Sequence, residues 1–209
     1  MSKNETSSLR FNSLSERLRY YTRDLTMWLG KQGLRLGLHP DLITVLGLVF
    51  VLIAAWLAAQ GQFLASGVVL IVALPLDVLD GAIARAMDRQ NQFGALLDST
   101  MDRYADGFMF FGLAYYFAAR GQLDEMALAI VALIGAYGVS YVRARAEGLG
   151  IRSIKEGWFD RLVRTVILTL MLLTGWIVPG LIILAIGNHL TTVQRVLVVW
   201  QATRNDATD

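Results

Sequence analysis

The chain has 209 residues, of which 55% are hydrophobic and 17% are charged, with a formal net charge of +2. Soluble domains carry about 25% charged residues. Here the mean hydropathy is +0.49 and the apolar residues form long runs, which indicates a polytopic membrane protein rather than a large soluble core. The absence of cysteine excludes disulfides, thiolate metal sites and a cysteine nucleophile.

The N-terminal region predicts an amphipathic helix on a membrane surface. Residues 1–12 are assigned to a mobile tail. Residues 13–37 mix arginine and lysine with leucine, methionine and aromatic residues such as Trp28. This mixture is typical of a juxtamembrane helix that lies on an anionic bilayer surface.

Six membrane-spanning helices are predicted over residues 38–201, so the expected fold class is all-α. The run 42–60 is uncharged over 19 positions and spans a bilayer by itself. The next two apolar runs are too short, so their helices must include the neighbouring charged residues: one continues toward Arg85 or Met87 and the next begins near Gly94. The remaining predictions are spans at about 124–146, 157–178 and 179–200, followed by a C-terminal tail at 202–209.

Lysine and arginine in the short loops predict the orientation of the chain. Basic residues gather on one side of the membrane, in the N-terminal helix, the 85–93 loop, the 143–164 segment and Arg195. The other side has only three short turns. Because basic loops stay in the cytoplasm, both termini and the ends of spans two and three at the 85–93 loop are expected on the cytoplasmic side of the cell membrane.

Aspartates interrupt the apolar pattern on both sides of that loop, at Asp77, Asp80, Asp98, Asp102 and Asp106. A charge at the centre of a membrane helix costs about 2.5–3.5 kcal/mol on insertion scales, so these carboxylates need compensation. The first two are i,i+3 and the next two are i,i+4, so each pair projects from one helix face. Helices joined by a short loop are expected to be antiparallel neighbours, which brings the four carboxylates together.

Two interpretations of these carboxylates are open. An all-oxygen site favours Mg²⁺, Mn²⁺ or Ca²⁺, and paired ions of this kind assist displacement at phosphorus. The alternative is a structural charge network with Arg85, Arg89 and Arg103. Because the two histidines, His39 and His189, have no partner at metal-ligand spacing, acid–base chemistry is left to Asp, Glu, Lys or Tyr.

The motif Asp77-x2-Asp80-Gly81-x2-Ala84-Arg85-x8-Gly94-x3-Asp98-x3-Asp102 resembles the signature of the CDP-alcohol phosphatidyltransferase family. The resemblance implies a membrane enzyme that binds CDP-diacylglycerol or CDP-archaeol, releases CMP and forms a homodimer. It implies two Mg²⁺ or Mn²⁺ ions held by Asp77, Asp80, Asp98 and Asp102, of which Asp102 is also the general base. It implies nucleotide contacts from Asp77, Gly81, Ala84, Arg85 and Gly94. Asp106 lies outside the signature and is interpreted as a polar residue on the helix face or as a partner of the site.

Four arginines at the cytoplasmic ends of spans four to six predict a phosphorylated acceptor, because guanidinium groups bind phosphate bidentately. They are Arg143, Arg161, Arg164 and Arg195. The segments SYVRARAEG (140–148), GWFDRLVR (157–164) and VQR (193–195) are similar to the phosphatidylinositol-phosphate synthase branch of the family. In that branch the residues at 143, 164 and 195 are implied to bind the phosphate of inositol phosphate, although lysine is common at 143.

Other functions remain as alternatives. Glycerol 3-phosphate is the second candidate acceptor, as in phosphatidylglycerophosphate synthases. A membrane prenyltransferase also uses aspartates and Mg²⁺ on a pyrophosphate, but it needs more spans and two separated aspartate motifs. A divalent-cation transporter requires polar residues across the whole membrane, whereas the segments 63–72 and 109–119 contain no carboxylate.

Overall fold

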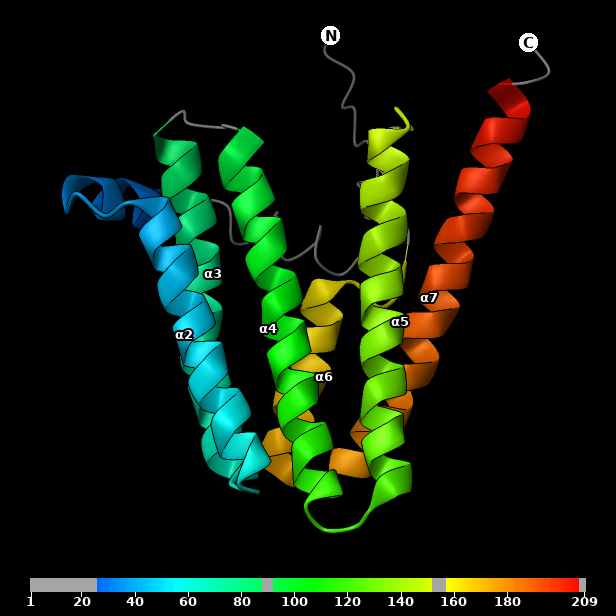
Figure 1. The fold of residues 1–209 in the computed structure, drawn as a ribbon. Helices are drawn as coiled ribbons and strands as arrows, with labels where there is room; N and C mark the ends of the chain where they lie inside the picture. Colours follow the sequence, from blue (N-terminus) through cyan, green and yellow to red (C-terminus); the bar gives the residue numbers. More distant parts are fainter. Residues whose placement is uncertain (1–25, 88–91, 152–156, 207–209) are drawn as a thin grey trace, which may run out of the picture.

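The computed structural model describes residues 26–87, 92–151 and 157–206, with the side chains of all of these except Asp77, Asn205 and Asp206. The predicted tail at 1–12, the first part of the amphipathic helix (13–25), Arg89 and residues 207–209 lie outside the described residues. The all-α prediction is confirmed for the described part of the chain. Its helices are α2 (Pro40–Ala59), α3 (Phe63–Ala86), α4 (Gln92–Ala118), α5 (Leu123–Gly148), α6 (Arg161–Thr174) and α7 (Ile177–Asp206) (Figure 1).

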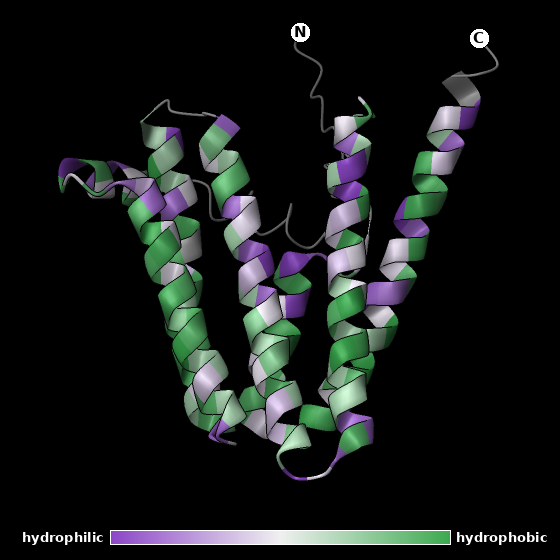
Figure 2. Cartoon of the chain, in the orientation of Figure 1, coloured by the Kyte–Doolittle hydropathy of each residue, from purple (hydrophilic) through white to green (hydrophobic). Residues whose placement is uncertain are grey.

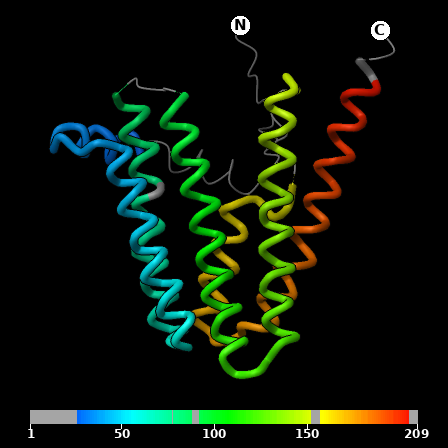
Figure 3. Tube along the Cα trace, viewed as in Figure 1, coloured from blue at the N-terminus to red at the C-terminus, as the bar shows by residue number. Residues whose placement is uncertain are grey.

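These helices form an up-and-down bundle. The beginning of α2 and the end of α7 lie at the same end of the molecule (Figure 3). Helix α2 packs against both α3 and α4, α5 packs against α4 and α7, and α6 packs against α3 and α7. The sequence predicted that α3 and α4 pack directly against each other. This prediction is corrected, because the main contacts of each helix are with α2.

Four helices, α2, α3, α5 and α7 as far as Arg204, are long and apolar enough to cross a membrane. Helix α4 has 27 residues but contains several charges, and α6 has only 14 residues, which corresponds to about 21 Å. Hydrophilic residues concentrate near the upper ends of the helices and at the beginning of α6, whereas the lower halves are mostly hydrophobic outside the turns (Figure 2). These features indicate a membrane protein whose polar residues gather toward one end.

Local signals explain where the helices begin and end. Pro40 occupies the first turn of α2, where its missing N–H is no loss. Helix α6 begins at Arg161 rather than near 157 because Asp160 is its N-cap: the Asp160 carboxylate accepts a hydrogen bond from the Val163 N–H at 3.0 Å. Gly175 ends α6 with φ +76°. Helix α7 begins two residues before the expected Pro179, which thereby lies in its first turn.

The residues 26–35 of the predicted amphipathic segment are helical and run outward from the top of α2 in Figure 1. Trp28 is 57% exposed, which agrees with a side chain that faces lipid or the membrane interface. Gly30 and Gly33 lie directly against Ala82 and Ile83 of α3. The segment is therefore docked on the same turns of α3 that contain the aspartate motif.

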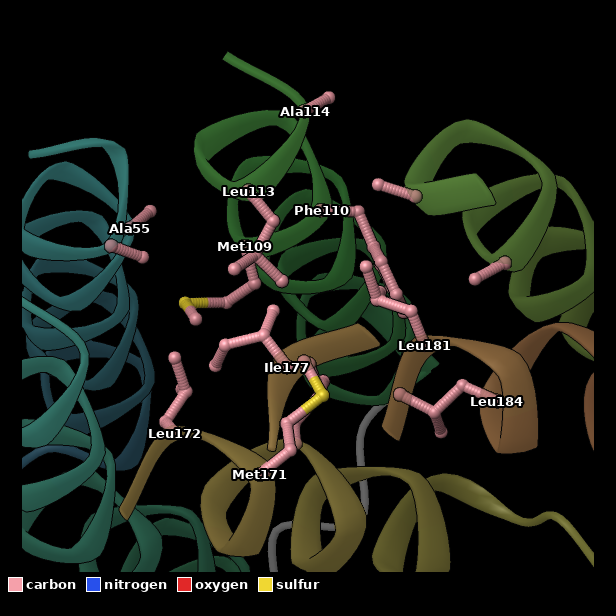
Figure 4. Close-up of a cluster of buried hydrophobic side chains, with 14 of the residues drawn as sticks. Ala55, Met109, Phe110, Leu113, Ala114, Met171, Leu172, Ile177, Leu181 and Leu184 are labelled. Atoms are coloured by element: carbon pink, nitrogen blue, oxygen red, sulfur yellow. The ribbon is translucent and has the colours of Figure 1, made fainter. Parts of the chain in front are cut away.

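The apolar core joins α4, α6 and α7 in the lower half of the bundle. In Figure 4 the side chains of Met109, Phe110 and Leu113 of α4 converge with those of Leu172 and Leu181, and all of these are buried. On α2 and α5 the buried positions are mainly alanines: Ala54, Ala55, Ala58, Ala129, Ala132 and Ala136. Small residues allow close helix approach, which is how van der Waals packing stabilises helices within a bilayer.

Substitution of Gly112 by alanine is expected to destabilise the bundle. A Cβ atom at this position of α4 would collide with the carbonyl oxygen of Ala55 on α2, and backbone atoms cannot move aside as a flexible side chain can. We expect a loss of about 1–3 kcal/mol, typical of overpacking, measured as thermal unfolding in detergent. Gly148→Ala is the matched control, because nothing lies within 4 Å of a Cβ there; equal melting temperatures would contradict the prediction.

Candidate active site

Asp80 is buried on α3 and its carboxylate is held from two sides. The Thr44 hydroxyl of α2 donates to Oδ2 at 2.6 Å, and the Gly81 N–H donates to Oδ1. A carboxylate with both oxygens engaged has a defined orientation. Sequence analysis did not single out Thr44; the available signal was a hydroxyl one turn after Pro40, in an otherwise apolar span.

Asp98 and Asp102 lie one turn apart on α4, as their spacing predicted. Oδ1 of Asp102 is 2.7 Å from Nη1 of Arg161 on α6, and Oδ2 is 3.7 Å from Nη1 of Arg103; the Asp102 side chain is 13% exposed. Arg161, predicted to contact the acceptor phosphate, is therefore the counter-ion of Asp102 in this structure. The ion pair brings the predicted base to the beginning of α6.

The carboxylates of this region bear on whether the chain can hold a divalent ion. Among them, no three acidic or histidine residues are close enough to form a metal site. The donor chemistry nevertheless suits a hard cation: Asp80 is fixed by hydrogen bonds, Asp98 and Asp102 occupy successive turns, and all donors are carboxylate oxygens. Convergence of these three with Asp77, whose side chain lies outside the described part, stays a prediction.

The predicted nucleotide contacts occupy the last turns of α3. Gly81, Ala84 and Arg85 have i, i+3 and i+4 spacing and so share one helix face. A Cβ atom at Gly81 would come within 3.3 Å of Nη1 of Arg85, so the guanidinium group lies directly beside this glycine. Gly94 lies in the first turns of α4, across the loop.

Arg164 is buried and forms an ion pair between helices. Its Nη2 lies 2.8 Å from Oδ2 of Asp106 on α4, with side-chain exposures of 3% and 9%. Its Nη1 is 3.5 Å from the Phe159 carbonyl oxygen. Its Nε is buried and has no hydrogen-bond partner among the described residues. The second interpretation of Asp106, as a partner of the site, is thus consistent with the structure.

The structure brings Arg195 together with two other predicted arginines. Arg143 and Arg164 both lie within electrostatic reach of Arg195, together with the acidic side chains of Asp160 and Glu147. Arg195 is 5% exposed and its Nη1 donates to the Val139 carbonyl at 2.7 Å. Arg143 is exposed and pairs with Glu147 at 3.0 Å. Three basic residues from α5, α6 and α7 therefore share one region.

The segment that precedes α6 closes over Arg195. Gly157 has φ +138°, a conformation that favours glycine, and a Cβ there would lie 2.8 Å from Cγ2 of Thr191 and 3.1 Å from Nε of Arg195. The Thr191 hydroxyl accepts a hydrogen bond from the Phe159 N–H at 3.2 Å. Thr191 was not predicted; it holds the loop against α7 so that Asp160 can cap α6.

Comparisons with known proteins agree with this arrangement. The sequence model of the CDP-alcohol phosphatidyltransferase family matches residues 37–201. An archaetidylinositol phosphate synthase of Pyrococcus horikoshii is 37% identical over 169 residues, covering 80% of this chain and 87% of the relative. A phosphatidylinositol phosphate synthase of Streptomyces avermitilis is 34% identical over 194 residues, covering 86% of this chain and 79% of the relative.

Two solved structures of a Mycobacterium tuberculosis phosphatidylinositol phosphate synthase are also similar. The structure with CDP-DAG bound has a TM-score of 0.77 at 31% identity and covers 85% of this chain and 94% of that chain. The structure in complex with manganese and citrate has a TM-score of 0.74 at 31% identity, covering 84% and 88%. The similarity therefore extends over the bundle and not only over the aspartate motif.

Proposed function

This chain belongs to the CDP-alcohol phosphatidyltransferase family, and from that premise we propose that it transfers the phosphatidyl or archaetidyl group of a CDP-linked lipid to a hydroxyl of inositol phosphate. The chain is an enzyme of this family, with relatives named phosphatidylinositol phosphate synthase. A CDP-lipid donor is supported by the related structure that contains CDP-DAG. The observation that supports the acceptor is the burial of Arg164 and Arg195 on the contacting helices α6 and α7, with Arg143 of α5 within electrostatic reach of Arg195.

In this proposal Asp77, Asp80, Asp98 and Asp102 hold two divalent cations, Mg²⁺ or Mn²⁺. The manganese complex of a related enzyme supports the use of a divalent metal. When bound, such ions neutralise negative charge on the pyrophosphate and on the departing CMP. Thr44 and the Gly81 N–H keep the Asp80 carboxylate in place for this role, and Gly81, Ala84, Arg85 and Gly94 line the nucleotide position.

Asp102 acts as the general base in the proposed reaction. Its carboxylate takes the proton from the acceptor hydroxyl, whose oxygen then forms a bond to the lipid-side phosphorus while the bond from that phosphorus to the CMP oxygen breaks. In the structure Asp102 is paired with Arg161 at 2.7 Å, which holds its carboxylate at the beginning of α6. Arg161 also lies at the start of α6, next to the region of the acceptor arginines, so it is placed to contact both the base and the acceptor.

We further propose that α4 and α6 complete a set of six spans, with both termini and the active site on the cytoplasmic side, and that the enzyme forms a homodimer. Helix α4 is longer than the ~20 residues that a bilayer requires. Asp102 and Asp106, which lower its hydropathy, face arginines of α6 rather than lipid. Charges inside membrane helices are expected to face the bundle interior and pair in this way.

One assay tests the proposal. The purified protein in lipid nanodiscs is given Mg²⁺, CDP-diacylglycerol and either inositol phosphate, glycerol 3-phosphate or free inositol, and CMP release is measured together with the lipid product. We expect turnover with inositol phosphate, and its complete loss with EDTA that is reversed by excess Mg²⁺ or Mn²⁺. Turnover with glycerol 3-phosphate but not with inositol phosphate would contradict the proposed acceptor. Turnover that resists EDTA would contradict the proposed divalent-cation site.

A further inference from the structure

We infer that Asp106 is a positioning residue for the acceptor: it orients the Arg164 guanidinium so that the remaining N–H groups face the acceptor phosphate. The inference rests on the proposed function, because it concerns the arginines assigned to the acceptor. Asp106 lies outside the aspartate motif and binds neither metal nor nucleotide in the mechanism above. Its role is exerted through Arg164.

The first observation is the buried ion pair between α4 and α6. Asp106 and Arg164 are separated by 58 positions, and their Oδ2 and Nη2 atoms are 2.8 Å apart in a region where both side chains are almost fully enclosed. Two charges away from water require close geometry to be tolerated. The planar guanidinium group is therefore held in one orientation, which an exposed arginine would not maintain.

The second observation concerns the Nη1 and Nε atoms of Arg164, which do not take part in the ion pair with Asp106. A guanidinium group has five N–H donors in a planar fork. Nη2 is occupied by Asp106, Nη1 makes only a 3.5 Å contact with the Phe159 carbonyl, and buried Nε has no hydrogen-bond partner among the described residues. Because a buried donor without an acceptor is unfavourable, a phosphate oxygen is the group that this edge is suited to bind.

The third observation is the charge around this edge. Arg164 and Arg143 both lie within electrostatic reach of Arg195, and so do the carboxylates of Asp160 and Glu147. Asp106 offsets the charge of Arg164, and Glu147 pairs with Arg143 at 3.0 Å. The Tyr137 hydroxyl of α5 donates to the Arg103 carbonyl at 3.0 Å and abuts Gly107. This contact fixes the turn of α4 that contains Asp106.

Asp106→Asn is the direct test, with KM values for both substrates measured by CMP release. We expect the acceptor KM to rise about 10- to 100-fold, the range for loss of a charge-assisted hydrogen bond, while the KM for CDP-diacylglycerol changes by less than about twofold. Asp124→Asn removes an exposed carboxylate from the beginning of α5 and serves as the charge control. An unchanged acceptor KM in Asp106→Asn, or an equal rise in both KM values, would overturn the inference.

A double-mutant cycle with Arg164→Gln separates positioning from a merely structural role. If Asp106 acts through Arg164, the Asp106→Asn/Arg164→Gln variant has the acceptor KM of Arg164→Gln alone, whereas independent roles make the two effects multiply. The double variant contains no unpaired buried charge, so we expect it to unfold at a higher temperature than either single variant. If Asp106→Asn alone does not fold, the double variant is compared with Arg164→Gln, and a clearly higher acceptor KM in the double variant would overturn the inference.

The same set of variants distinguishes failure of the inference about Asp106 from failure of the proposed acceptor site. If Arg164→Gln raises the acceptor KM and Asp106→Asn does not, only the inference about Asp106 fails. If Arg164→Gln leaves the acceptor KM at the wild-type value, the proposed acceptor site itself fails. Binding without turnover gives a second readout: inositol phosphate with Mn²⁺ should raise the melting temperature of the wild type more than that of Asp106→Asn.

Discussion

Asp102→Asn is expected to lower kcat by about 10²- to 10⁴-fold, the usual contribution of a general base, while the protein remains folded. Asparagine has nearly the same shape and still accepts a hydrogen bond from Arg161, which lies 2.7 Å from the Asp102 carboxylate. It cannot take a proton from the acceptor hydroxyl. We therefore expect the loss to fall on kcat, measured by CMP release at saturating substrates, with an unchanged melting temperature.

Two controls accompany this variant. Mn²⁺ binding, followed by electron paramagnetic resonance, reports whether the remaining carboxylates still hold metal when Asp102 is neutral. Asp41→Asn changes a partly exposed aspartate at the beginning of α2, beside His39, and should leave turnover within about twofold. Near-normal kcat in Asp102→Asn would remove Asp102 as the base; lost kcat with lost Mn²⁺ binding would show that its main contribution is to the metal site.

Arg195→Ala is expected to give the largest effect on the acceptor. Arg195 is buried on α7 and donates to the Val139 carbonyl of α5, and Arg143 and Arg164 lie within electrostatic reach of it. Its loss removes a phosphate donor and about 1.5–3 kcal/mol of charge-assisted hydrogen bonding, which corresponds to a roughly 10- to 150-fold fall in kcat/KM for inositol phosphate. The KM for CDP-diacylglycerol should stay near the wild-type value.

The matched control is Arg204→Ala, on the same helix but exposed and stacked over Trp200. It should leave both KM values unchanged, because surface contacts of this kind contribute little. Arg195→Lys should recover part of the loss, since lysine keeps the charge without the planar fork. If Arg195→Ala leaves the acceptor KM unchanged while the protein remains folded, the acceptor site lies elsewhere.

The helices could be predicted closely because their signals are local. The uncharged run 42–60 and the interrupted runs around Asp77 and Asp106 predicted α2, α3 and α4 to within a few residues. The beginning of α6 differed because a single side chain decided it: Asp160 caps the helix at Arg161. A hydropathy pattern contains no information about a single hydrogen bond, whereas the helix start depends on the bond from the Val163 N–H to Asp160.

For the candidate site, the sequence predicted where residues lie along each helix but not which residues of different helices form pairs. Spacing placed Asp98 and Asp102 on one face of α4, and Arg161 and Arg164 on successive turns of α6, because side-chain direction along a helix follows from the backbone. It did not reveal that Asp102 pairs with Arg161 or that Asp106 pairs with Arg164. Thr44 gave only a weak signal, since one hydroxyl in an apolar helix commonly bonds within its own helix.

The amino-acid sequence by itself determined the helical class, the approximate bounds of each helix and the family, because hydropathy, capping residues and motif spacing act over a few turns of chain. Only the tertiary structure decided which charges meet. It placed α2 against both α3 and α4, and set the beginning of α6 beside the carboxylates of α4. The physical reason is that these ion pairs form between residues 58 or 59 positions apart, and the distance between the two charges depends on how several helices pack at once.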